Sequence, residues 1–392
     1  MPFLGGSLAF ERYNVSGFDG SMFSEDQMEI LQNYSAGQTQ TSSTENVHVG
    51  FLGGQHLFDT DFDLAKNIIN DALHCGVRID TNQIPAAIRK AWLQMELSRS
   101  GQDNASGVPT KAQRKEAKEA VEQRCEVEAA TGKYRRMQQF PILWDAASQM
   151  LYFGGSFGNA SGHCADLLER TFEIELRHVS AGSLALQWGA TNTQLAAVED
   201  LVPACFVPGK QYGMPTWTSE HSQAPDFLGN EFLLWLWWTT EHQSENIDLP
   251  DDSDVTVMLT KTLSLECPAG ESGKESISAL APTQLPEAFQ AVRSGKLPRK
   301  SGITAVRHGR QFDLVLQAET FGISGAKIHV ESDEEFGVED RIDAIRLLSE
   351  TIDLMFFSFC ARRVSKAWAS DLTKITEWLT GDSAKAGKSA AA

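Results

Sequence analysis

The sequence lacks closely spaced cysteines. Its six cysteines lie far apart, and no two of them are within four residues of each other. This spacing excludes a CxxC metal pair and a compact disulfide framework. The first residues, MPFLGGSLAFERY, contain neither a basic segment nor an apolar run long enough for export. We therefore expect reduced thiols in a cytoplasmic protein.

Long apolar runs are also missing. The longest, FLGNEFLLWLWW at 227–238, has about a dozen residues and is interrupted by an Asn and a Glu, whereas a transmembrane helix needs roughly 18 or more. We expect a buried helix capped by Asp226, and no membrane partner. The alternative is an aromatic surface that contacts a protein partner through three tryptophans: Trp235, Trp237 and Trp238.

Signatures of catalysis are scarce. Nine histidines are scattered without an HExxH or HxH pair, so we expect no zinc site. The neighbours His163 and Cys164 have no identifiable third group to orient them for nucleophilic catalysis. GGSFGNASG at 154–162 lies where a phosphate-binding loop could lie, but it contains no GxGxxG, and His163 stands where a P-loop has Lys. We expect a strand–helix turn there, no cofactor, and no catalytic or metal-binding residue.

The chain also lacks an excess of basic residues. The chain has 34 basic and 52 acidic residues and a net charge of −18, which taken alone argues against nucleic-acid binding. The charge is uneven, however: residues 293–310 include six basic and no acidic side chains, and residues 111–136 include eight basic and five acidic ones. Basic patches on an acidic protein can steer DNA to one surface.

Acidic residues are concentrated in a different segment, at 331–340. ESDEEFGVED at 331–340 carries six carboxylates, which we expect to form a solvated loop. A metal-dependent nuclease would need such carboxylates beside a lysine on a strand, and we identify no convincing site of this kind in the sequence.

Hydrophobic periodicity in the first hundred residues predicts strands and helices in alternation. SEDQMEILQNY at 24–34 begins with a cap residue and acids, and IPAAIRKAWLQMEL at 84–97 has Pro85 in its first turn, so both segments are expected helices. The other expected segments are strands at 8–13 and 47–52, a polar loop at 38–45, and strand segments at 57–59 and 76–80 around a helix near 65–74.

A polar, Gly- and Ser-rich linker at 98–109 precedes a charged helix at 110–129, whose mixed signs allow i,i+4 pairing. Such a helix is often only a solvated face. The remaining expected elements are two strands within 140–158 joined by a turn at 145–148, a helix at 163–177, strands at 255–265, 303–306 and 312–318, and a long amphipathic helix or helix pair at 341–368.

Segregated strands and helices without an internal repeat predict an α+β fold of mixed antiparallel sheets and helices. The length of 392 residues predicts several lobes. We expect an N-terminal α+β lobe at 1–98, a lobe with the charged helix, a basic tip and a β-hairpin at 99–180, a C-terminal α+β lobe with a basic strand and a long helix at 181–378, and a disordered tail at 379–392.

The most informative short segment is Lys133-Tyr134-Arg135-Arg136, which places one aromatic ring among three cations. It follows the charged helix and precedes the strand expected at 141–145. Cations position a phosphate backbone, while a ring can stack on bases or wedge between them.

The order of these elements resembles the RdgC family of bacterial recombination-associated proteins. In one block RKEAKEAVEQR is followed by GKYRRMQQF, PILWD, QMLYFGG and CADLLERTF, and in a second VTVMLTKTLSL is followed by EAFQAVRSGKLPRKSGITAVRHGRQFDLVLQ. Tyr134 falls where the family has a Phe, and Trp144-Asp145 falls on its Trp/Ile-Asp step. The N-terminal block also matches in order, and the resemblance covers most of 3–360. The Trp-rich segment at 227–238 has no place in the best-known members.

The resemblance implies a non-enzymatic, nucleoid-associated homodimer that closes into a ring around double-stranded DNA. It also implies binding without sequence preference and antagonism of RecA filament formation. A metal-dependent nuclease, or a protein-interaction module that uses 227–238, stays open as the alternative. The expected DNA-binding residues are Lys111, Arg114, Lys115, Lys118, Lys133, Arg135 and Arg136, with Tyr134 as a stacking ring, and a second basic patch of Lys261, Lys296, Arg299 and Lys300.

Overall fold

A computed structural model describes residues 3–20, 22–38, 47–102, 104, 107–155, 159–209, 214–217, 224–270, 272–330 and 335–381. The expected α+β class is confirmed, because helices accompany a large sheet in which the neighbouring strands with a resolved register are antiparallel. The chain divides into two compact units. Unit 1 comprises Met1–Ser16, Leu143–Ser156 and Leu176–Ala392, and unit 2 comprises Gly17–Ile142 and Phe157–Glu175.

These units differ from the division expected at residues 98 and 180. The reason lies in strand pairing: β1 (Leu8–Ser16) pairs with β6 (Met150–Gly154) and with β13 (Ile323–Ile328). The first strand of the chain therefore belongs to the same unit as the C-terminal half, and each unit is assembled from separated segments.

Unit 2 contains the strand order β5-β4-β2, with β3 beside β4. Helix α5 packs on β2 and β4. The bounds are α1 Glu25–Asn33, β2 Val47–Leu52, α2 Leu64–Asn67, β3 Ile68–Ile69, β4 Ala72–Asn82, α3 Ala86–Gln102, α4 Lys111–Ala130, β5 Arg135–Asp145 and α5 Asn159–Phe172, and β5 continues into unit 1 from Leu143.

Local signals account for the elements of unit 2 that the sequence predicted. The Ser24 hydroxyl and the Gln27 side chain form a capping box at the start of α1, and Thr110 and Gln113 do the same for α4. The strand expected at 47–52 is confirmed with its bounds as β2.

Three expectations within unit 2 are wrong. Residues 57–59 form no strand. The helix near 65–74 is only the one-turn α2, because Asn70 and Asp71 both adopt positive φ (48° and 61°) and turn β3 into β4. The linker at 98–109 is not a domain boundary, because α3 continues to Gln102 and the connection joins α3 to α4. The expected polar loop at 38–45 lies almost entirely outside the described residues.

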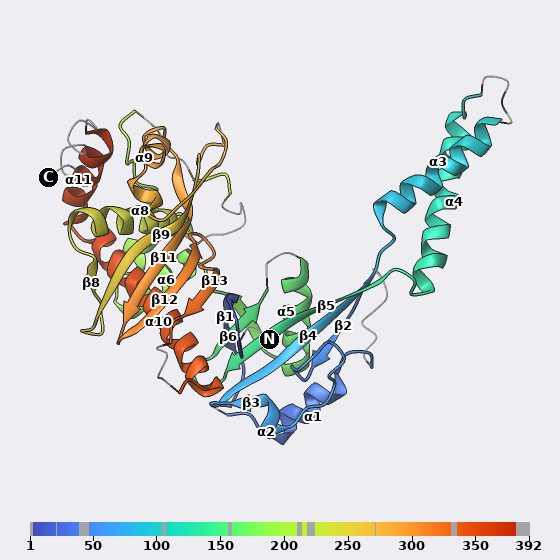
Figure 1. Cartoon of the computed structure of the whole chain (residues 1–392), viewed down its shortest axis with the longest axis horizontal. Coiled ribbons are helices and arrows are strands. Elements are labelled where there is room, and N and C mark those ends of the chain that lie inside the picture. Colours follow the sequence, from blue (N-terminus) through green and yellow to red (C-terminus); the bar gives the residue numbers. More distant parts are fainter. Residues whose placement is uncertain are drawn as a thin grey trace. The chain divides into compact units, whose positions relative to one another are not determined.

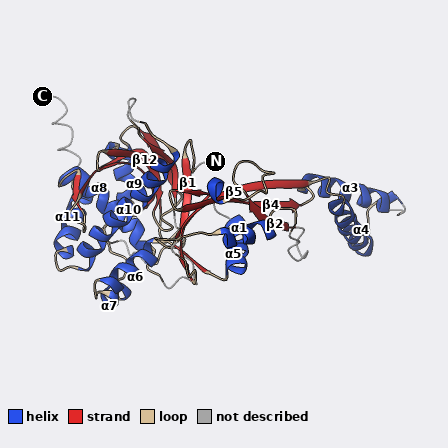
Figure 2. Cartoon of the chain, turned by 90° about the horizontal axis from the view of Figure 1, so that it is seen from below, coloured by secondary structure: helices blue, strands red, loops and turns tan. Residues whose placement is uncertain are grey.

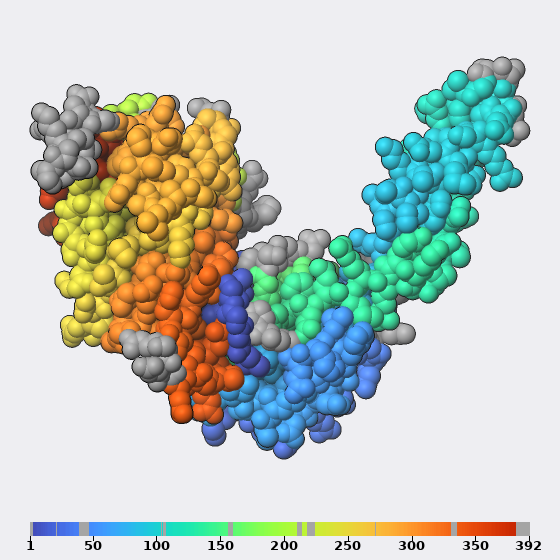
Figure 3. Space-filling model, viewed as in Figure 1, coloured from blue at the N-terminus to red at the C-terminus, as the bar shows by residue number. Residues whose placement is uncertain are grey.

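Helices α3 and α4 form an antiparallel hairpin. Figures 1 and 2 show it beyond the end of β4 and β5 and away from α1 and α5, within unit 2. Trp92 of α3 and Ala117 and Val121 of α4 form its buried seam, and the Arg124 guanidinium lies 4.3 Å from the centre of the Trp92 ring. In Figure 3 the outer surfaces of both helices are uncovered by other elements of unit 2.

Unit 1 contains the strand order β10-β9-β11-β12-β13-β1-β6-β5, with β7 beside β1 and β8 beside β9. The expected strands at 255–265, 303–306 and 312–318 are confirmed within β9, β11 and β12. The remaining bounds are β7 Glu175–His178, β8 Asn246–Asp248, β9 Asp254–Glu266, β10 Glu275–Ala279, β11 Leu297–Arg307 and β12 Arg310–Gln317.

The helices of unit 1 cover one side of this sheet, as Figures 1 and 2 show for α6, α8 and α10 over β9, β11 and β12. The expected long helix or pair is a pair, α10 and α11. The helix expected at 163–177 is α5, which ends at Phe172 before β7. The bounds are α6 Ala181–Thr191, α7 Leu195–Glu199, α8 Phe227–His242, the 3₁₀ helix Pro282–Gln284, α9 Pro286–Arg293, α10 Val338–Val364 and α11 Trp368–Thr380.

Helix α8 is buried along Phe227–Thr239, as its apolar sequence predicts. The Phe232 ring lies 5.4 Å from Phe356 of α10 and 6.1 Å from Phe321 in the turn between β12 and β13, and α8 also packs on β11, so α8 joins α10 to the sheet. Trp235, the most exposed of the three tryptophans, is only 7% exposed, which rules out the partner-facing aromatic surface. No helix in the described ranges is both long and apolar enough to cross a membrane.

Asp226 stands at the N-cap of α8 but makes no side-chain cap there. Its carboxylate instead accepts hydrogen bonds from the Ser180 hydroxyl (2.6 Å) and the Gly182 amide (2.9 Å) at the start of α6. Asp226, which was expected to cap α8, therefore links the start of α8 to the start of α6.

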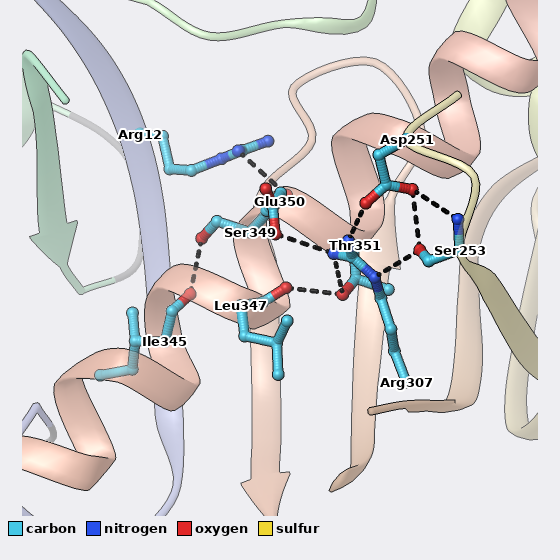
Figure 4. Close-up of polar contacts among 9 residues, drawn as sticks. All are labelled: Arg12, Asp251, Ser253, Arg307, Ile345, Leu347, Ser349, Glu350 and Thr351. Carbon is cyan, nitrogen blue, oxygen red and sulfur yellow. Dashed lines mark hydrogen bonds and ion pairs between the residues drawn. The ribbon is translucent and has the colours of Figure 1, made fainter. Parts of the chain in front are cut away.

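Two buried arginines attach the middle of α10 to the sheet (Figure 4). Arg12 of β1 donates two hydrogen bonds of 2.6 Å to Asp353, and Arg307 of β11 donates to Glu350 at 2.8 Å and to Asp251. Both guanidinium groups are at most 2% exposed. Each carboxylate thus offsets the cost of burying a cation between the helix and the sheet.

Phe232→Ala should lower the free energy of unfolding by about 3–5 kcal/mol, because it removes a buried ring that contacts α10 and the sheet. Urea unfolding followed by tryptophan fluorescence measures this change. Leu195→Ala, at a 39% exposed position of the same unit, should shift it by less than about 0.5 kcal/mol. Equal losses in the two variants would contradict this account of the core.

Candidate nucleic-acid interface

A concentration of exposed positive charge lies on α4. Lys111, Arg114, Lys115 and Lys118 are spaced by three and four residues, so they share one helix face. All four are exposed. Lys115 lies 3.6 Å from Glu119, but an exposed pair of this kind is weak, so a phosphate can replace the carboxylate. We call these four side chains the α4 stripe.

A groove between α3 and α4 brings more cations to the α4 stripe. Lys90 lies across the groove from Lys118, and Arg89 is ion-paired with Glu122 there. The groove therefore has an apolar floor, and its rim carries Arg89, Lys90 and Lys118 together with the carboxylate of Glu122. It is lined by Ala86, Arg89, Lys90, Leu93, Lys118, Val121 and Glu122.

Lys90 and Arg89 were not among the residues expected from the sequence. They were missed because the expected linker at 98–109 assigned α3 to another lobe. Two amphipathic helices with a short connection are also the signature of a helical hairpin, which is the signal that would have found them.

The basic segment Lys133-Tyr134-Arg135-Arg136 was expected at a tip, and the structure corrects this. It lies where a turn at 131–134 joins α4 to β5, which is the base of the hairpin. Lys133 and Arg136 are exposed, and the Lys133 ammonium is 5.6 Å from the centre of the half-buried Tyr134 ring. Arg135 is ion-paired with the buried Asp80.

The second expected patch is not a single cationic surface. Lys296 is 6% exposed and ion-paired with Glu275 of β10. Arg299 pairs with Glu266 at 2.9 Å and Glu319 at 2.6 Å, and its guanidinium lies 4.3 Å from the centre of the Trp217 ring. Both cations are already neutralised within unit 1, so they add little to a field that attracts phosphate.

Lys261 and Lys300 are more accessible. Lys300 is half-exposed on β11. Lys261 is exposed, with a φ of 64° at an irregularity in the β9–β11 pairing, and its ammonium lies 2.5 Å from Asp313 of β12. Asp313 also accepts from Thr304 at 2.7 Å and lies 3.1 Å from His329. Lys327, which pairs with Asp313 in the strand register, adds an exposed cation that the sequence did not indicate.

Other cations of the run at 293–310 are used internally. Arg307 holds α10, and Arg293 donates to the Gly381 carbonyl (2.7 Å) and the Leu379 carbonyl at the end of α11. The Arg310 guanidinium lies 4.9 Å from the centre of the Phe336 ring. A high density of cations in the sequence is therefore not a high density on the surface of unit 1.

The features considered for catalysis gain no support. Among the described residues, no group of three or more His, Cys, Asp or Glu side chains is placed to hold a metal ion. Burial raises the pKa of the Cys164 thiol, which opposes a reactive thiolate. Of the acidic run, 331–334 lie outside the described residues, and Glu339 and Asp340 form the first turn of α10. Of the glycine-rich segment, 156–158 also lie outside them.

Comparison with models of known protein families finds no match to this chain, and comparison with curated proteins finds no relative. The candidate interface therefore rests on the geometry and charge of the hairpin.

The contacts of Asp313 should make unit 1 sensitive to acid. Burial alone would raise the pKa of Asp313, but hydrogen bonds from Lys261, Thr304 and His329 outweigh it and hold that pKa well below its ordinary value. A depressed pKa in the folded state gives stability that is present above the unfolded pKa of about 4 and is lost as the pH falls toward the folded one. Asp313→Asn should therefore melt below the wild type at neutral pH, and the gap in melting temperature should narrow as the pH falls below about 4.

Thermal melts of both proteins between neutral pH and about pH 3 measure the gap. Asp200→Asn, an exposed position of unit 1, is the control and should show no gap. A gap for Asp313→Asn that stays constant over the whole range would refute the contribution of its charge.

Proposed function

We propose that this chain is a sequence-independent double-stranded DNA-binding protein whose α3–α4 hairpin carries the main phosphate-binding surface. The observation that supports this most directly is the α4 stripe with Lys90 across the groove. Exposed cations at regular spacing suit a repeating anion, and contacts to the phosphate backbone carry no sequence information.

The local charge favours a polyanionic partner. Residues 84–136 contain 11 basic and seven acidic residues, a net of +4 in a chain whose net charge is −18. Because the rest of the chain is strongly acidic, it repels DNA and favours contact at the hairpin.

The length of the α4 stripe suits several phosphates. From Lys111 to Lys118 it extends about 10 Å along the helix axis, at about 1.5 Å per residue. Phosphates of one DNA strand rise about 3.4 Å each, so the stripe reaches roughly three of them. Lys133 and Arg136 at the base of the hairpin extend the contact to a segment of duplex.

The resemblance to the RdgC family adds two parts to the proposal: a homodimer that closes into a ring around the duplex, and modulation of RecA-dependent recombination. Light scattering of the purified protein tests the first, because a monomer at all concentrations would contradict it. A RecA strand-exchange assay with and without the protein tests the second, and an unchanged rate would contradict it.

Binding to a short duplex should weaken steeply with salt. The structure records no ion pair, among the residues it describes, for six exposed cations of unit 2: Lys90, Lys111, Arg114, Lys118, Lys133 and Arg136. Neutralising roughly six phosphates gives a slope of about −5 in log K against log salt, or about three orders of magnitude between ~50 and ~200 mM. Fluorescence anisotropy at several salt concentrations measures the slope.

Matched lysine variants locate the contact. Lys118→Gln should bind somewhat more weakly and make the slope shallower by about one unit. Lys366→Gln, at an exposed position of unit 1, removes the same charge and should leave both unchanged. A wild-type slope near zero would overturn the phosphate-binding surface.

Tyr134→Ala should weaken duplex binding by about tenfold or more without changing the salt slope, because base–aromatic stacking contributes ~1–3 kcal/mol and no cation is lost. Tyr134→Phe keeps the ring and should bind like the wild type. A thermal melt of each variant accompanies the titration. A lower melting temperature with unchanged affinity of the folded fraction would show that the half-buried ring only packs.

A further inference from the structure

We infer that Asp80 is a positioning residue for the basic segment at 133–136, an inference that rests on the proposed DNA binding and extends it. Asp80 lies on β4 within unit 2, and only 3% of its side chain is exposed. Its carboxylate contacts two arginines, Arg78 of the same strand and Arg135 at the start of β5.

The side chains of the two arginines differ in their exposure to solvent. Arg78 is 6% exposed: its Nε lies 3.0 Å from Oδ1 of Asp80, its Nη2 donates to Oδ2 at 3.1 Å, and its Nη1 donates to the Leu57 carbonyl at 3.2 Å. Arg135 donates from Nη2 to the same Oδ2 but is 41% exposed. A guanidinium has five N–H donors, so Arg135 keeps donors for a phosphate while Asp80 holds it.

A buried carboxylate beside the basic segment at 133–136 requires a physical explanation. A surface that served only to attract DNA would gain from losing it, since Asp80 cancels one positive charge beside Lys133 and Arg136. A surface that must hold its cations in a fixed geometry gains from keeping it. Ordering one long side chain on binding costs about two- to tenfold in affinity, and an arginine that is already anchored avoids that loss.

The anchor acts on more than one side chain. Successive side chains of a strand point to opposite faces, so Arg136 points away from the face on which Arg135 meets Asp80. Fixing Arg135 to β4 therefore also fixes the direction of Arg136 and the end of the turn that carries Tyr134.

Charge and positioning predict opposite results for Asp80→Asn. The variant raises the local charge by one, so charge alone predicts tighter binding and a steeper salt slope. Positioning predicts binding that is about two- to tenfold weaker with an unchanged slope. Glu119→Gln is the matched control, because it also removes an acid from the proposed surface, at the exposed partner of Lys115, and touches no anchor. It should bind more tightly.

Asp80→Asn leaves the buried Arg78 without its carboxylate, so the unit can lose stability. Asp80→Glu keeps both charges and displaces the carboxylate by one methylene group, and it should also bind more weakly at unchanged slope. Circular-dichroism melts give the folded fraction to which each affinity is referred. If the folded fraction of Asp80→Asn binds as tightly as the wild type or more tightly, the positioning role is wrong.

Coupling to Arg135 separates positioning from general support of the fold. If Asp80 acts through Arg135, then Asp80→Asn should change affinity little in an Arg135→Gln background, whereas a purely structural role would cost the same in both backgrounds. Failure of the proposed function itself looks different: a wild-type protein that binds no duplex at low salt. A wild type that binds with the expected slope, while Asp80→Asn tightens binding, overturns only the role of Asp80.

Discussion

Carboxylates outnumber cations in this chain by 52 to 34, and this excess decides which cations remain free for a partner. In unit 1 the fold brings carboxylates of β10, of the turn after β12 and of α10 against Lys296, Arg299 and Arg307. The cations of that run therefore hold strands and helices together. The hairpin has only two layers and no sheet against it, so the α4 stripe faces solvent. Among the described residues, unpaired positive charge is therefore exposed on the α3–α4 hairpin, where few carboxylates are packed against it.

The buried ion pairs specify arrangement more than they add stability. Desolvation of two charges nearly cancels their attraction, while loss of one partner leaves a costly buried charge. Arg12 can thus be satisfied only if α10 lies where Asp353 reaches it, and Glu350 of α10 adds to the pairing of Arg307 with Asp251. Glu231 of α8 is likewise paired with Arg363 of α10, at 2.6 Å. Burial raises the pKa of Glu231, while the positive charge of the arginine opposes that shift. In this way the polar contacts fix how α8 and α10 lie on a core that is otherwise aliphatic and aromatic.

The sequence predicted what depends on neighbours along the chain. Capping at Ser24, the strand at 47–52, the charged helix and the burial of α8 all follow from local patterns. It did not predict the turn at Asn70–Asp71, where two non-glycine residues adopt positive φ. Nor did it show that α3 belongs with α4, or that Lys296 and Arg299 are paired. The pairings of Lys296 with Glu275 and of Arg299 with Glu266 depend on contacts between residues far apart in the chain. The spacing of cations in the sequence contains no information about the carboxylates that the fold places opposite them.

The cations of unit 2 fall into two physical classes. Lys90, Lys111 and Lys118 are flexible and exposed, and such ammonium groups attract any phosphate backbone with little demand on geometry. Arg124 is stacked on Trp92 and Arg135 is held by Asp80, so both guanidinium groups are ordered before a ligand arrives. In the proposed function, the exposed lysines would supply binding without sequence preference. The ordered class would impose a geometric requirement, because a planar guanidinium fixed on the fold meets a phosphate only along certain directions. A surface with both can prefer the regular backbone of a duplex over a flexible single strand while remaining indifferent to sequence.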